Sequence, residues 1–572
     1  MSDAVYGGLA IGVVIVATVL IGTFALRLSR TTSDFYVASR TVSPAWNAAA
    51  IGGEYLSAAS FLGIAGLILT YGADMLWFPV GYTAGYLVLL VLVAAPLRRS
   101  GAYTLPDFAE ARTESRSVRR IASILVVTIG WLYLLPQFVG AGLTVRLATG
   151  APGWVGGLLV AAVVVFSVAT GGMRSITFVQ AFQYWLKLTA LAVPVLFLVL
   201  AWQADGSPTP DDGPPTFAER TSVTVSATVR FVVRDPVAVV VDGRLDGTTY
   251  DGERLPLALG PHTAAMGTEL AFPAGATVPH AQSLEPADND RWASPLSGAG
   301  GRGHPVYATY SLILALFFGT MGLPHVLVRF YTNPDGRTAR RTTLIVLCLL
   351  GLFYLFPTVY GALARVYTTD LLLTGRTDTA VLLLPERLVA GVGGELLTAL
   401  VTGGAFAAFL STSSGLTVSV AGVLSQDVLR GQVRDFRMAA ALAVVVPFGL
   451  SLLASTLAVA DVVGLAFAVA ASSFCPLLVL GIWWRRLTSV GAATGLLVGG
   501  GLATAAVTAT IAGVDRAGWV GALLAQPAAW TVPVAFAVMV VVSLRTPDRI
   551  APNVGRTMVR LHAPETIALG DR

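Results

Sequence analysis

Charged residues are scarce in this sequence. Asp, Glu, Lys and Arg make up 12% of its 572 residues, whereas a soluble domain has about 25%. Hydrophobic residues make up 55% of the chain, and its mean hydropathy is +0.74. This balance excludes an ordinary soluble domain and predicts an all-α polytopic membrane protein.

Motifs for covalent and nucleotide chemistry are also missing. The two cysteines, Cys348 and Cys475, lie in separate apolar runs and form neither a CxxC pair nor a disulfide framework. The chain has no GxxxxGK[ST] loop for ATP, and the predicted tail, 546–572, is too short for a kinase or ATPase domain. We therefore expect a protein that is not an enzyme and has no bound cofactor.

The basic residues follow a membrane pattern. The net charge of +5 and the isoelectric point of 9.3 would suit nucleic acid, but arginines cluster in short loops between apolar runs, as the positive-inside rule requires. We expect the lipid bilayer, and no nucleic acid, as a partner. The arginine loops alternate along the chain, which predicts a multi-pass protein of the cell membrane with its N-terminus outside and its C-terminus in the cytoplasm.

About thirteen apolar runs are long enough to cross a hydrocarbon layer of about 30 Å. The first six lie in 1–203, the other seven lie in 305–545, and 546–572 is the tail. The predicted spans are 5–27, 44–70, 75–97, 121–147, 154–170, 177–202, 306–331, 341–366, 395–426, 437–457, 460–483, 490–511 and 528–545.

A polar segment, 204–304, separates the two groups of spans and is predicted to be extracellular. Val223–Val229 alternates with period two, and Val237–Val241 is followed by Asp242-Gly243. These are strand and turn signals. We expect a small β-rich insertion, with a disordered loop as the alternative.

Two spans carry signs of an interrupted helix. The second span has Gly52-Gly53 at mid-membrane beside Glu54, Tyr55 and Ser57, and helix-weakening glycines with polar neighbours are typical of a transporter site. The seventh span has the sequence FGTMGLP, 318–324, which makes Phe318, Thr320 and Met321 further candidates for substrate contact or coupling. The two breaks open blocks of five spans, the signature of an inverted repeat. Ordinary glycine and proline kinks are the alternative.

The ninth span is rich in hydroxyl groups. In 403–427, the carbonyl of Ala408 and the hydroxyls of Ser411 and Thr412 are three or four residues apart and share one helix face. Three neutral oxygens suit a hard, weakly held cation. The alternative is that these small residues serve close helix packing.

Several charged or polar residues lie inside predicted spans. Glu54 could coordinate a cation, carry a proton or pair with a buried donor. Lys187 is expected to pair structurally or to extend towards the interface. His325 and Arg329 are expected nearer the inner mouth than the site, with attraction of a carboxylate as the alternative. Tyr133 and Gln137 are candidate substrate contacts, with core packing as the alternative.

Together, these residues resemble the sodium/solute symporters, and within them the cation–acetate or monocarboxylate branch. The resemblance covers predicted spans two to twelve. It implies a LeuT-like five-plus-five inverted repeat with an added first helix, and a Na+ site formed by the carbonyls of Gly53, Leu56 and Ala408 and the hydroxyls of Ser411 and Thr412. The matching segments are SDFYVASR (33–40), GEYLSAASFLGIAG (53–66), GGMRS (171–175), GTMGLPHVLVRFYT (319–332) and AAFLSTSSGLTVSVAGVLSQD (407–427).

The resemblance implies a symporter that works as a single transport unit by alternating access. It would couple inward movement of Na+ or H+ to uptake of a small organic anion such as acetate or pyruvate. The alternatives are another solute (proline, a vitamin or a sugar), a transporter-like sensor, and a channel.

Overall fold

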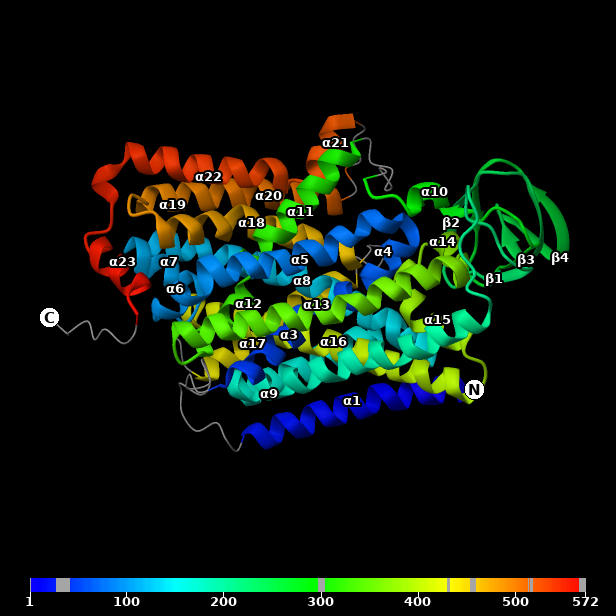
Figure 1. Ribbon diagram of the computed structural model, residues 1–572, viewed down its shortest axis with the longest axis horizontal. Coiled ribbons are helices and arrows are strands. Elements are labelled where there is room, and N and C mark those ends of the chain that lie inside the picture. The colour runs from blue at the N-terminus through cyan, green and yellow to red at the C-terminus, as the bar shows by residue number, and fades with distance from the viewer. Residues whose placement is uncertain are drawn as a thin grey trace.

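The computed structural model describes residues 2–26, 42–296, 304–429, 433–452, 459–512, 514 and 518–564. Long apolar helices run side by side along the longest axis of the molecule (Figure 1). Within the described residues, ten helical stretches are long and apolar enough to cross a membrane. The motif at 33–40 lies outside the described residues.

The helices of the bundle follow the predicted spans closely. Helix α9 is interrupted at Gly172, where a positive φ of 58° divides the predicted fifth span from the sixth. The main helices of the predicted spans are α1 (Ser2–Leu26), α3 (Pro44–Tyr55), α4 (Ile64–Tyr71), α5 (Trp77–Val88), α6 (Ala94–Arg99), α8 (Arg116–Thr149), α9 (Gly153–Ala204), α11 (Pro305–Gly322), α13 (Gly336–Tyr367), α16 (Val392–Val423), α17 (Val433–Ser451), α18 (Val459–Trp483), α19 (Ser489–Gly495), α20 (Gly501–Ile511) and α22 (Ala528–Arg545). The other α-helices are α7 (Leu105–Thr113), α10 (Asn289–Trp292), α12 (Pro324–Val328), α14 (Asp370–Thr374), α15 (Ala380–Leu388), α21 (Gly518–Ala525) and α23 (Val554–His562).

The second span is interrupted, but not at the predicted residues. Gly52 and Gly53 remain helical in α3, and the chain leaves the helix at Leu56 before a π-helical turn, Ala59–Gly63, leads into α4. The glycines instead allow α9 to approach. A Cβ on Gly53 would lie 2.2 Å from the carbonyl oxygen of Gln180. These glycines therefore serve close packing, and the break follows them.

The seventh span is interrupted after α11. Leu323 has an extended backbone (φ −72°, ψ 115°), and Pro324 begins α12. A proline disfavours helical geometry in the residue before it, which explains the position of this break. Phe318, Thr320 and Met321 are still helical, in the last two turns of α11.

A seven-stranded antiparallel sheet lies between α9 and α11 in the sequence. Its strand order is β1-β6-β3-β5-β2-β7, and β4 pairs with β3. The sheet and the start of α1 lie at one end of the bundle, and α23 lies at the other (Figure 1). The strands are β1 (Thr221–Thr224), β2 (Val229–Val233), β3 (Val237–Leu245), β4 (Thr248–Leu257), β5 (Gly260–Ala264), β6 (Glu269–Phe272) and β7 (His280–Ala281).

Arg365 of α13 joins the bundle to the segment after the sheet. Its guanidinium is buried and donates to the carbonyl of Leu69 at 3.0 Å, to that of Ala287 at 2.5 Å and to Asn289 Oδ1 at 2.9 Å. The planar fork of arginine can satisfy three acceptors at once. Arg365 therefore ties the end of α4 to the chain that leaves the strands.

Arg365→Met is expected to lower the free energy of unfolding by about 2 kcal/mol or more, because it leaves buried acceptors without a donor. Arg234→Met is the control, since Arg234 makes an exposed pair with Asp288 at 3.2 Å, and such pairs contribute under about 1 kcal/mol. Thermal unfolding of both variants in one detergent tests this. Equal losses of unfolding free energy in Arg365→Met and Arg234→Met would contradict the role given to Arg365.

Candidate functional site

The broken end of α3 lies against α16, as the sequence predicted. The hydroxyl of Thr412 donates to the carbonyl of Glu54 at 2.7 Å, and both residues are fully buried. This bond fixes the last turn of α3 before the chain leaves the helix at Leu56. The second and ninth predicted spans therefore meet at the residues proposed to bind a cation.

Lys187 of α9 lies at the centre of this meeting point. Its ammonium donates to the carbonyl of Gly53, to the carbonyl of Leu56 at 2.7 Å and to the hydroxyl of Ser411 at 2.8 Å. Ser411 in turn donates to the carbonyl of Ala408 at 3.1 Å. Four of the five predicted cation-site residues thus surround Lys187 directly or through Ser411. Of the two roles expected for Lys187, the structure shows pairing.

Glu54 forms a buried ion pair with Arg329. The two side chains are each 1% exposed, and Arg329 Nε lies 2.7 Å from a carboxylate oxygen of Glu54. Arg329 also donates to Thr177 at 2.7 Å and to the side-chain oxygen of Gln180. Arg329 was expected nearer the inner mouth, with attraction of a carboxylate as the alternative, and it contacts the carboxylate of Glu54 because the break at Pro324 carries the following residues against α3 and α9.

Gln180 connects the ion pair to α16. Its side-chain nitrogen donates to the carbonyl of Ser411 at 2.8 Å and to the hydroxyl of Ser414 at 3.2 Å. Sequence reasoning did not single out Gln180. Its spacing of seven residues from Lys187 puts both on one face of an apolar helix, and this signal could have identified it.

The two helix breaks also face each other. The hydroxyls of Tyr55 and Thr320 are hydrogen-bonded at 2.9 Å. Phe467 of α18 packs beside this pair, with its ring centroid 6.1 Å from that of Tyr55 and 5.9 Å from that of Tyr133. Met321 is fully buried on the same helix end. Candidates from α3, α8 and α11 therefore gather around one aromatic side chain.

The other substrate candidates are Gln137, Ser57 and Phe318. Gln137 accepts a hydrogen bond from the backbone nitrogen of Ala58 at 3.3 Å, which holds the chain in the break, and Ser57 is fully buried there. Phe318 is half-buried and packs both against the main apolar core and against a smaller cluster that contains Val532.

Polar groups without partners line this aromatic region. Among the described residues, the hydroxyls of Tyr82 and Tyr86 and both ring nitrogens of His325 are buried without a hydrogen bond. The ring centroid of Tyr133 lies 5.2 Å from that of His325, and that of Tyr82 lies 5.0 Å from that of Phe467. Buried polar groups are normally paired, so these atoms are available to a small polar ligand.

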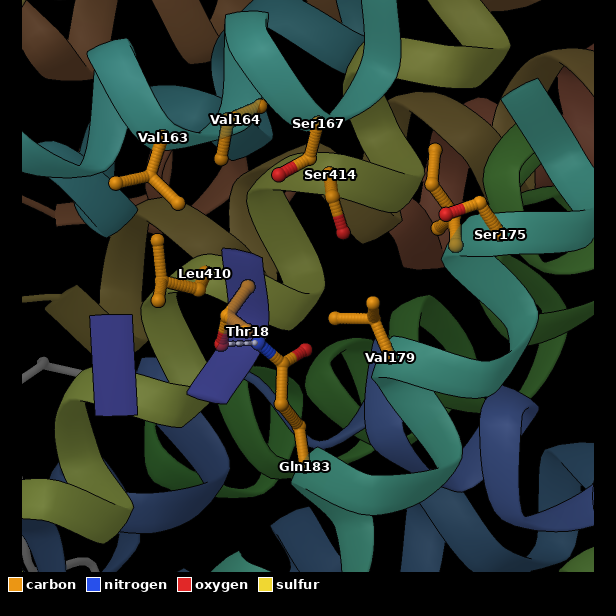
Figure 2. Close-up of a pocket in the computed structure, with 10 residues that line it drawn as sticks. Thr18, Val163, Val164, Ser167, Ser175, Val179, Gln183, Leu410 and Ser414 are labelled. Atoms are coloured by element: carbon orange, nitrogen blue, oxygen red, sulfur yellow. Dashed lines mark hydrogen bonds between the residues drawn. The ribbon is translucent and has the colours of Figure 1, made fainter. Parts of the chain in front are cut away.

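A small pocket lies between α1, α9 and α16. Figure 2 shows Ser414 of α16, Ser167 of α9 and Thr18 of α1 around this pocket, where the side-chain nitrogen of Gln183 donates to the hydroxyl of Thr18 at 3.1 Å. None of the predicted substrate residues lines this pocket. Ser414 is also a hydrogen-bond partner of Gln180, so the pocket adjoins the buried polar network.

Other transport proteins match most of this chain. An uncharacterized symporter of Bacillus subtilis is 30% identical over 84% of the chain and 82% of its own length. A protein named monocarboxylic acid transporter, from Corynebacterium glutamicum, is 29% identical over 92% of the chain and 90% of its own length.

Two solved transporters share the fold. A Na+-coupled sialic acid symporter in a substrate-bound, outward-open state covers 96% of the chain and 98% of its own chain, with a TM-score of 0.62 and 14% identity. A transporter of the nucleobase-cation-symport-1 family covers 93% and 99%, with a TM-score of 0.51 and 12% identity. The fold is therefore the LeuT-like fold that the resemblance implied.

The sequence profile of one family matches the chain in two parts, residues 35–207 and 280–499. The unmatched residues between them hold strands β1 to β6. The profile covers both groups of helices that form the buried network. The chain belongs to the sodium:solute symporter family.

Proposed function

We propose that this protein is a secondary active symporter that takes up a small monocarboxylate, such as acetate or pyruvate, coupled to inward movement of a cation, Na+ or H+. The observation that carries the proposal is the meeting of two interrupted helices, α3 and α11–α12, beside a buried charged network. Discontinuous helices at mid-membrane are how secondary transporters build their sites. The relative named monocarboxylic acid transporter supports the choice of solute.

The substrate would bind between the two breaks. The ring of Phe467 supplies an apolar wall for the short carbon chain. The unpaired hydroxyls of Tyr82 and Tyr86 and the imidazole of His325 can donate to a carboxylate. Tyr55 and Thr320 join the two breaks, so a shift of either helix would change this space. Differential affinity of substrate and cation for the two positions would drive alternating access.

We further propose thirteen spans in the cell membrane, with the N-terminus and the strands outside and the tail at 546–572 in the cytoplasm. The arginine loops support this orientation, and so does the placement of the strands and α23 at opposite ends of the bundle (Figure 1). We propose that one chain forms the complete transport unit, because its own helices supply every residue of the network.

Uptake of labelled acetate and pyruvate into proteoliposomes tests the proposed function. We expect saturable uptake that a cation gradient drives above equilibrium, and competition by short monocarboxylates but not by proline, a vitamin or a sugar. Stronger competition by one of those solutes would change the substrate class. Binding without uptake would support a sensor, and uptake that does not saturate would support a channel.

A further inference from the structure

Lys187 is the single lysine of this chain, whose 37 basic residues are otherwise all arginine. It is also fully buried. An ammonium group is a compact charge with three donors, whereas a guanidinium is a flat fork. The one position that holds lysine is therefore the one where a small, round cation is surrounded by oxygens.

The three donors of Lys187 match three acceptors. They are the carbonyl of Gly53, the carbonyl of Leu56 at 2.7 Å and the hydroxyl of Ser411 at 2.8 Å. A Na+ ion held by the same three oxygens would lie where the ammonium nitrogen lies. Two cations cannot share that position, since their repulsion is strong in a site closed to water.

We propose that the ammonium of Lys187 holds the place of a bound Na+ in this protein, so that transport proceeds without Na+ at this site. Lys187 is then the residue that sets ion specificity, and uptake draws on a gradient other than that of Na+. This inference rests on the proposed function, because it names the ion that the symporter does not require.

Uptake by the wild-type protein is the first test. We expect the initial rate of monocarboxylate uptake to change by less than about twofold when K+ replaces Na+ on both sides of the proteoliposome membrane, since a ligand that does not bind cannot shift the two conformations. Uptake that requires Na+ would overturn the inference and leave the proposed function intact. No uptake under Na+, K+ or proton gradients would instead overturn the proposed function.

The second test detects cation binding from the melting temperature and does not depend on transport. In wild-type protein, replacing K+ by Na+ should leave the melting temperature unchanged. In Lys187→Met, which frees the three oxygens, the melting temperature should rise saturably with Na+, because a ligand of the folded state stabilises it. Gln183→Met is the control, because it removes a buried polar side chain one turn away on the same helix. Its melting temperature should not rise with Na+.

A saturable Na+ shift in wild-type protein would overturn the inference. A folded Lys187→Met variant without any Na+ shift would overturn it too, because the freed oxygens would then not form a Na+ site. If Lys187→Met does not fold, the wild-type measurements alone decide the question.

Discussion

Arg329→Met is expected to lower the free energy of unfolding by about 3–5 kcal/mol, because it leaves the carboxylate of Glu54 buried without its charged partner. Both side chains are 1% exposed, and the ion pair is 2.7 Å long. Water cannot reach the carboxylate to replace the lost guanidinium. Thermal unfolding of the purified variant in detergent measures the loss.

The double variant Glu54→Gln with Arg329→Met is the matched control. It removes both charges, and replacing a buried pair by neutral groups is often close to neutral for stability. We therefore expect the double variant to unfold at a higher temperature than Arg329→Met alone. A double variant that is less stable than either single variant would show that the two residues do not act chiefly as a pair.

Gly53→Ala is expected to lower the free energy of unfolding by at least about 3 kcal/mol, above the usual range for an overpacked core. The added Cβ would lie 2.2 Å from the carbonyl oxygen of Gln180. That oxygen belongs to the backbone of α9, so no side-chain rotation relieves the contact. The two helices must separate, which also moves the Gly53 carbonyl away from Lys187.

Gly422→Ala on α16 is the control for this substitution. Gly422 is also buried and helical, but a Cβ there would meet no heavy atom within 4 Å. Alanine favours a helix over glycine by about 1 kcal/mol, so Gly422→Ala should be neutral or stabilising. Melting temperatures of the two variants give the comparison, and a Gly53→Ala protein as stable as Gly422→Ala would refute the close contact between α3 and α9.

Both helix breaks could be predicted from the local sequence, but only the second lies at the residues that the sequence singled out. Glycines weaken a helix in isolation, which is why Gly52-Gly53 was expected to mark the first break. In the structure, α9 packs against these glycines and keeps them helical. Pro324 was a better marker, because its ring restricts the preceding residue whatever the tertiary context.

The meeting of Ser411 and Thr412 with the end of α3 was implied by the family resemblance, whereas helix periodicity placed only Ala408, Ser411 and Thr412 on one face. The pairing of Glu54 with Arg329 was not predicted, because the two residues are 275 positions apart and nothing local relates them. The same holds for Gln180, whose partners are Arg329, directly after α12, and residues of α16.

The sequence by itself determined the membrane class and the family, and it singled out the residues whose oxygens surround Lys187, because hydropathy, arginine placement and local motifs are properties of contiguous chain. Only the tertiary structure decided what lies among those oxygens. Lys187 reaches them from another helix, and its three hydrogen bonds depend on how α3, α9 and α16 pack, which helical periodicity alone does not encode.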